Sequence, residues 1–205
     1  RGEVELTDVL QRACEQAAVR PVSFQRWLDV GRPWELLAAN EWKLPELDGR
    51  RRGEVSDDAH LDGTVVVEPG ATVRPGVVIE GPAYIGRDAS VGPNAYVRGA
   101  TILGPDTKVG HSVEVKNSVV MRGTSVGHLS YVGDSVLGEN VNFGAGTVVA
   151  NLRHDDSTVR VTVKGDRVDT ARRKFGVVCG PEAKTGLHTA LNAGVAVLDG
   201  QRQRP

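Results

Sequence analysis

The sequence predicts a mainly β protein, a left-handed parallel β-helix built from hexapeptide repeats. Glycine is frequent, with 25 residues, and aromatic residues make up 4% of the chain, which suits many tight turns around a core of small side chains. A six-residue period is neither that of an α-helix nor that of a single strand, whereas stacked triangular coils of three short strands produce it. The first ten aliphatic positions of the repeat are Leu61, Val67, Val73, Ile79, Ile85, Val91, Val97, Leu103, Val109 and Val115.

The repeat continues with two one-residue shifts of register. The first shift puts the inward position at Val120 and the second puts it at Leu137, after which the repeat resumes at Phe143 and Val149. Following an interruption it returns at Cys179 and runs to position 197. Each hexad gives one strand and one turn, and successive coils stack at the spacing of neighbouring β-strands.

Three segments do not follow the hexads. Residues 7–18 and 33–42 have the pattern of amphipathic helices, and the second begins with Pro33, in a position where proline is favoured. Between about residues 153 and 176, valines alternate with polar residues around a Lys-Gly-Asp turn. This pattern predicts a hairpin or loop inserted into the β-helix.

Charge and composition exclude several functional classes. The net charge is −1 and the basic residues are not clustered, so neither nucleic acid nor a membrane surface is expected as a partner. No apolar run is long enough to span a bilayer, and no signal peptide opens the sequence. Cys14 and Cys179 lie far apart outside any CxxC motif, which indicates a reducing, cytoplasmic location.

The repeat also predicts which outward side chains share a face. Arg98 and Lys116 are one coil apart, and each directly follows an inward residue. Glu114 and Tyr131 precede inward residues on the same face, while His128 enters that face at a corner. Two stacked cations without adjacent acids favour a phosphate site. An imidazole can act as a general base, and a carboxylate beside it can orient the ring.

Asn151 and the segment Gly144–Gly146 complete this candidate site. Asn151 lies in the corner that leaves the face, and bare N–H groups in the glycine-rich segment could polarise a carbonyl or hold a pantetheine amide. Each residue also has an ordinary explanation, since exposed basic side chains are usually solvated and asparagine favours turns. Their convergence on one face favours a functional site.

A zinc site is a further alternative. Zinc-dependent carbonic anhydrases with this architecture use three histidines, two of them five residues apart. Five residues before and after His128 lie Gly123 and Gly133, so the sequence does not favour that reading.

The stretch "GHLSYVGDSVLGENVNFGAGTVVANL", with the preceding "VEVKNS", closely resembles bifunctional sugar-1-phosphate nucleotidylyltransferase/acetyltransferases of archaeal type. The resemblance implies acetyl-CoA-dependent N-acetylation of glucosamine-1-phosphate in UDP-N-acetylglucosamine synthesis, by a homotrimer with sites between neighbouring subunits. Galactosamine-1-phosphate is an equally open substrate.

The resemblance also assigns roles. Catalysis would involve His128 as base, Glu114 as its supporting carboxylate and Asn151, which positions acetyl-CoA near the amine. Arg98 and Lys116 would hold the sugar phosphate, Tyr131 and Asn142 would contact the sugar, and Ala145 and Gly146 would contact acetyl-CoA. The family commonly has a lysine soon after "ANL", where this chain has Ser157, and Arg160 is the expected substitute.

Residues 1–52 resemble the end of the same family's Rossmann-like nucleotidylyltransferase domain, and residues 53–205 its β-helix. Asp29, in "LDVGRP", resembles an aspartate that helps to bind Mg²⁺. The glycine-rich nucleotide-binding segment is missing, so nucleotide transfer is expected only of a full-length parent. Because the carboxyl end is short, a noncatalytic module that assembles or regulates a nucleotidylyltransferase is the second hypothesis.

Overall fold

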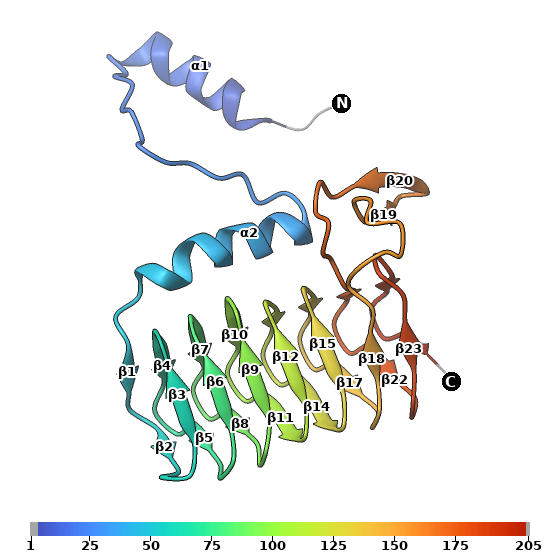
Figure 1. Cartoon of the computed structure of the whole chain (residues 1–205). Helices are drawn as coiled ribbons and strands as arrows, with labels where there is room; N and C mark the ends of the chain where they lie inside the picture. Colours follow the sequence, from blue (N-terminus) through green and yellow to red (C-terminus); the bar gives the residue numbers. More distant parts are fainter. Residues whose placement is uncertain (1–3, 204–205) are drawn as a thin grey trace.

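A computed structural model describes residues 4–203 as a row of triangular coils formed by three parallel sheets (Figure 1). Sheet A contains, in hydrogen-bonded order, β1 (Arg50–Arg51), β4 (Val65–Val67), β7 (Ala83–Ile85), β10 (Thr101–Leu103), β13 (Val119–Val120), β16 (Val136–Leu137), β21 (Val178–Cys179) and β24 (Ala196–Val197). Sheet B contains β2 (Glu54–Val55), β5 (Thr72–Val73), β8 (Ser90–Val91), β11 (Lys108–His111), β14 (Ser125–His128), β17 (Asn142–Phe143), β22 (Lys184–Thr185) and β25 (Arg202–Gln203). Sheet C contains β3 (His60–Asp62), β6 (Val78–Glu80), β9 (Tyr96–Arg98), β12 (Glu114–Lys116), β15 (Tyr131–Gly133), β18 (Val148–Val149) and β23 (Ala190–Leu191). The predicted parallel β-helix is confirmed.

The register shifts read from the sequence appear in the strand pairing. Val97 pairs with Val115, which is 18 residues later in the chain. Leu103 pairs with Val120, and Val120 with Leu137, so the offset is 17 residues in each case. Shortening a turn by one residue therefore leaves the inward column intact.

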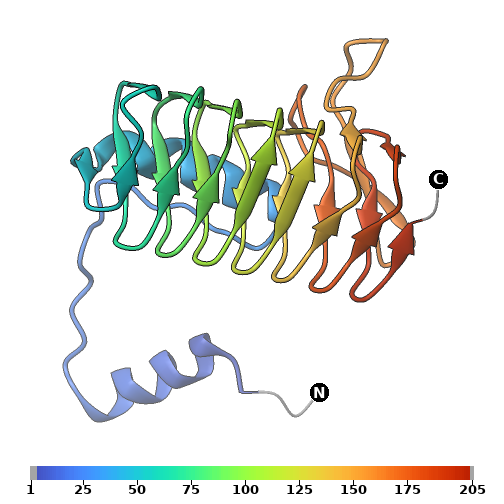
Figure 2. The ribbon, with the colours of Figure 1, turned by 90° about the horizontal axis from the view of Figure 1, so that it is seen from below.

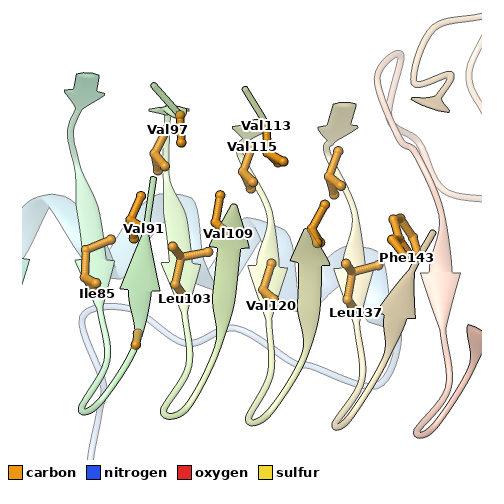
Figure 3. Close-up of a cluster of buried hydrophobic side chains, with 14 of the residues drawn as sticks. Ile85, Val91, Val97, Leu103, Val109, Val113, Val115, Val120, Leu137 and Phe143 are labelled. Carbon is orange, nitrogen blue, oxygen red and sulfur yellow. The ribbon is translucent and has the colours of Figure 1, made fainter. Parts of the chain in front are cut away.

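Inward aliphatic side chains fill the middle of the coils. Ile85, Val97, Leu103 and Val115 have no exposed surface, and the neighbouring coils repeat the arrangement (Figure 3). Because each aliphatic side chain lies above another of the same kind, one hydrophobic column runs through every coil.

The second helix packs on the outside of sheet A. α2 (Pro33–Lys43), followed by the 3₁₀ turn η1 (Leu44–Glu46), lies across the coils (Figures 1 and 2). Its Trp34 and Leu37 are buried with Val119, Val136 and Phe175 in a second core. α2 is thus packed against the coils.

The inserted segment begins where the chain leaves sheet C. It contains the antiparallel hairpin β19 (Arg160–Val163) and β20 (Asp166–Asp169), as the alternating pattern predicts. The N–H of Phe175 donates to the carbonyl of Asn151 at 2.9 Å, so the two ends of the insertion meet at one corner of a coil. The hairpin projects from one end of the β-helix (Figure 2).

Residues 4–32 make little contact with this core. α1 (Leu6–Gln16) has no buried residue and stands apart from the coils in both views (Figures 1 and 2). The helices match the segments expected at 7–18 and 33–42 to within two residues at each end. None of the helices in the described part of the chain is both apolar and long enough to cross a membrane.

Candidate active site

The two outward cations of sheet C lie next to each other, as expected, but each has an acidic partner. Arg98 and Lys116 are paired in register on β9 and β12. Nε of Arg98 donates to Oε1 of Glu114 at 2.8 Å, and Nζ of Lys116 donates to Oδ2 of Asp134 at 2.8 Å. The expectation of cations without adjacent acids is therefore wrong, because Glu114 pairs with Arg98 and the corner residue Asp134 pairs with Lys116. The two positive charges and the two negative charges on this surface therefore sum to zero.

Tyr131 and Asn151 extend the same surface. Tyr131 pairs in register with Glu114, and Nδ2 of Asn151 donates to the tyrosine hydroxyl at 3.1 Å. Burial raises the pKa of Tyr131, and the nearby carboxylates of Asp134 and Glu114 raise it further. The phenol therefore stays protonated at neutral pH, and since its oxygen already accepts from Asn151, its proton is available to a ligand.

Asp134 is the residue that the sequence analysis missed. It is 2% exposed, and its carboxylate accepts hydrogen bonds from the side chains of Lys116, Asn117 and Asn151. Its signal in the sequence is its place in the repeat, at the corner position that asparagine occupies in the coils before and after it. Aspartate at a turn is so common that this signal alone did not distinguish it.

His128 ends β14 at the corner before this face, and its imidazole is exposed. It is in register with His111 of the preceding coil. Within residues 4–203 its ring makes no hydrogen bond to the protein, and Glu114 bonds to Arg98 instead of to His128. The structure thus brings His128 to the edge of the site with an unengaged ring, and it gives Glu114 a different partner from the one expected.

The glycine-rich segment lies one coil beyond His128. The N–H of Gly146 donates to the carbonyl of His128 at 3.1 Å, and the N–H of Gly144 donates to the Thr185 hydroxyl at 2.9 Å. Two of the three N–H groups expected to be bare are therefore engaged. Among the described residues, the N–H of Ala145 has no protein acceptor.

Exposed apolar side chains surround this corner, and sequence reasoning did not select them. Leu129, Val148 and Leu187 are 63%, 49% and 61% exposed. Leu129 directly follows His128, and Leu187 follows Gly186 at the same corner of a later coil. Such side chains suit the apolar stretches of a pantetheine arm.

Three residues expected in the site lie away from the outward face of sheet C. Asn142 is exposed on sheet B, between Ser125 and Lys184 in register, and does not share the face of Arg98. Arg160 lies on the hairpin, with Nε 4.0 Å from Asp169. Asp29 is exposed in the segment before α2, and within residues 4–203 no group of three or more His, Cys, Asp or Glu side chains could hold a metal ion.

The chain matches a family model and a curated relative in sequence. Residues 79–179 match the family model described as GMPPB C-terminal domain. Over 199 residues the chain is 44% identical to the bifunctional sugar-1-phosphate nucleotidylyltransferase/acetyltransferase of Sulfurisphaera tokodaii, with 96% of this chain and 50% of that protein covered. The chain is a homologue of these bifunctional enzymes.

A second curated relative and a solved structure are also similar to this chain. The bifunctional protein GlmU of Methanocaldococcus jannaschii is 45% identical over 198 residues, with 96% of this chain and 48% of that protein covered. The chain thus spans about half the length of the curated relatives it matches. A solved hexapeptide transferase family protein from Anaplasma phagocytophilum is 19% identical, with a TM-score of 0.47 and 74% of each chain covered.

Proposed function

We propose that this chain transfers the acetyl group of acetyl-CoA to the amine of an amino-sugar 1-phosphate, either glucosamine-1-phosphate or galactosamine-1-phosphate. The observation that carries the proposal is the gathering of Arg98, Lys116 and Tyr131 on sheet C with Asn151 at the corner that follows it, beside the corner that holds His128. The names of the relatives, which join a sugar-1-phosphate nucleotidylyltransferase to an acetyltransferase, support it.

In this mechanism His128 handles the proton. The substrate amine attacks the thioester carbonyl, a C–N bond forms and the C–S bond breaks. Neutral His128 takes the proton that the amine loses and passes it to the departing thiolate. The exposed imidazole, which makes no hydrogen bond to another side chain in the described part of the protein, is free for this exchange.

Acetyl-CoA would be held at the same corner as His128, one coil further along the β-helix. The N–H of Ala145 can donate to the thioester oxygen as negative charge develops there. Leu129, Val148 and Leu187 would cover the apolar part of the pantetheine arm. Gly146 contributes by its backbone shape, with φ of 76°, because its own N–H is engaged.

Charge balance favours a partner subunit at the phosphate. Arg98 and Lys116 already face Glu114 and Asp134, so a phosphate dianion on this face needs additional positive charge. A homotrimer with the site between subunits would supply it. Arg160 is the candidate donor because its side chain is 60% exposed on the projecting hairpin.

The test of this function is thiol release from acetyl-CoA with glucosamine-1-phosphate or galactosamine-1-phosphate. We expect His128→Ala to lower turnover by about 100-fold to 10,000-fold, the usual contribution of a general base. His111→Ala is the matched control, because His111 is exposed at the same corner one coil earlier. Wild-type turnover in His128→Ala, or an equal loss in His111→Ala, would remove His128 from the mechanism.

A second candidate function is a noncatalytic module that assembles a nucleotidylyltransferase. The cancelled charges of the phosphate site favour it, because a scaffold needs no free cation. Absence of acetyl transfer from a folded protein of trimeric mass would support this alternative.

A further inference from the structure

One corner of the coils changes composition along the β-helix. It follows sheet C, and the strand register aligns its residues one above another. The first three coils have glycine there, and the next three have amide or carboxylate side chains. In order, the column is Gly63, Gly81, Gly99, Asn117, Asp134 and Asn151.

Backbone shape does not explain the change. Gly63 and Gly99 have φ of 69° and 64°, and Asn117 and Asp134 have φ of 45° and 49°. Glycine adopts this left-handed conformation at the lowest cost, and asparagine and aspartate tolerate it. Because glycine already serves the same corner in earlier coils, the polar side chains of the later coils have another role.

The contacts of Asp134 indicate that role. Its Oδ2 accepts from Nζ of Lys116 at 2.8 Å and from Nδ2 of Asn151 at 2.5 Å, and its Oδ1 accepts from Nδ2 of Asn117 at 2.9 Å. A buried ion pair seldom stabilises a fold more than a well-packed apolar pair would. The pair of Asp134 and Lys116 is better explained by the positions in which Asp134 holds the side chains of Lys116 and Asn151.

A further contact fixes Asp134 from behind. Nδ2 of Asn117 also donates to Oε1 of Glu41 on α2 at 2.7 Å. Glu41 in turn forms an ion pair with Arg172 of the insertion. The amide between Asp134 and Glu41 therefore connects the site to both segments that pack outside the coils.

We propose that Asp134 is a positioning residue, which holds the ammonium of Lys116 and the amide of Asn151 in the arrangement that receives the sugar phosphate. This inference rests on the proposed function. It differs from a simple electrostatic view, in which Asp134 competes with phosphate for Lys116, and the two views predict opposite changes in KM.

The first experiment measures kcat and KM for glucosamine-1-phosphate in Asp134→Asn, which preserves the shape of the side chain and removes its charge. Positioning predicts that KM rises about tenfold, the effect of one weakened charge-assisted hydrogen bond. In a Lys116→Ala background the same substitution should raise KM little further, because its effect passes through Lys116. An unchanged or lowered KM in Asp134→Asn would overturn the proposal.

Asp106→Asn is the matched control. Asp106 also has a left-handed backbone, with φ of 58°, and pairs with Arg122 at 2.5 Å on another part of the surface. Its substitution should leave both kinetic constants unchanged. Equal changes of kcat and KM in the two variants would show that Asp134 has only a structural role. The same conclusion would follow if thermal unfolding showed that the loss of activity in Asp134→Asn equals its loss of folded protein.

A second readout does not depend on turnover. Labelling of Lys116 by acetic anhydride, followed by mass spectrometry, should be several-fold faster in Asp134→Asn than in wild type or Asp106→Asn. Faster labelling in a protein that acetylates neither amino-sugar phosphate would refute the proposed function while confirming that Asp134 holds Lys116. Unchanged labelling would overturn the positioning role itself.

Discussion

The inward residues of sheet C are of the same type in every strand, whereas its outward residues differ between the early and the later strands. Its inward column is aliphatic from Leu61 to Leu191. On the outward side, β3 and β6 present Asp62 and Glu80 as neighbours in register, followed by glycine corners. β9 presents Arg98 at the same position, still followed by a glycine corner, and β12 presents Lys116, followed by the polar corner of Asn117.

This difference shows how a repeat can carry a local site. The inward residues determine the coil, and they are alike in coils with and without the candidate site. The outward positions are under no such packing constraint, so they can change from one coil to the next without altering the fold. Function is therefore expected to depend on outward residues of the later coils and to be insensitive to those of the earlier coils.

Among the outward positions of sheet C, the largest effect should come from Gly133→Ala, which follows Lys116 in the register. An added Cβ would lie 2.4 Å from the hydroxyl of Tyr131 and 2.7 Å from Nδ2 of Asn151. The two side chains must then move, and displacement of a site by about 1 Å can cost roughly 100-fold in rate. We expect turnover to fall by that factor while the thermal midpoint changes little.

Gly49→Ala is the control for this substitution. A Cβ at Gly49 would meet its nearest atom, the carbonyl oxygen of Val65, at 3.5 Å, which is an ordinary contact. Full turnover in Gly133→Ala would show that the close packing of Tyr131 and Asn151 is not needed for activity.

A smaller effect is expected from two tyrosines in one outward column. Tyr96 and Tyr131 both pair in register with Glu114. Tyr131→Phe removes one of the two acceptors of the Asn151 amide, and we expect KM for the sugar phosphate to rise about tenfold, as for one lost hydrogen bond. Tyr96→Phe loses only an exposed bond to Glu80, so its KM should match wild type. Equal effects of the two substitutions would show that the bond between Tyr131 and Asn151 does not determine KM.

The sequence was sufficient for the coils because the inward column is a one-dimensional pattern. Both register shifts, at Val120 and Leu137, could be placed from aliphatic spacing alone, and the strand pairs agree. The stacking of Arg98 on Lys116 follows from the same count. No comparable rule indicated that α2 would pack on sheet A, because its partner Phe175 lies in the insertion, where the repeat is absent.

The site was less predictable because side-chain pairing depends on distances that spacing does not give. Glu114 precedes an inward residue near both Arg98 and His128, and only the structure shows that it bonds to Arg98. Asp134 looked like an ordinary turn residue until its three donors were placed around it.

The smallest effect on activity should come from an inward residue, Cys179, whose thiol pKa is raised to about 12 by burial. The folded state therefore binds this proton more tightly than the unfolded state, where the thiol has its usual pKa of about 9. Stability from this group is complete below pH 9 and decreases by about 1.4 kcal/mol per pH unit between pH 9 and pH 12. The free-energy difference between wild type and Cys179→Ala, measured by denaturant unfolding, should decrease over that window.

Exposed Cys14→Ala should show no such change, and both variants should acetylate at the wild-type rate at pH 7. A loss of turnover in folded Cys179→Ala would contradict the conclusion that inward residues determine stability and outward residues determine activity.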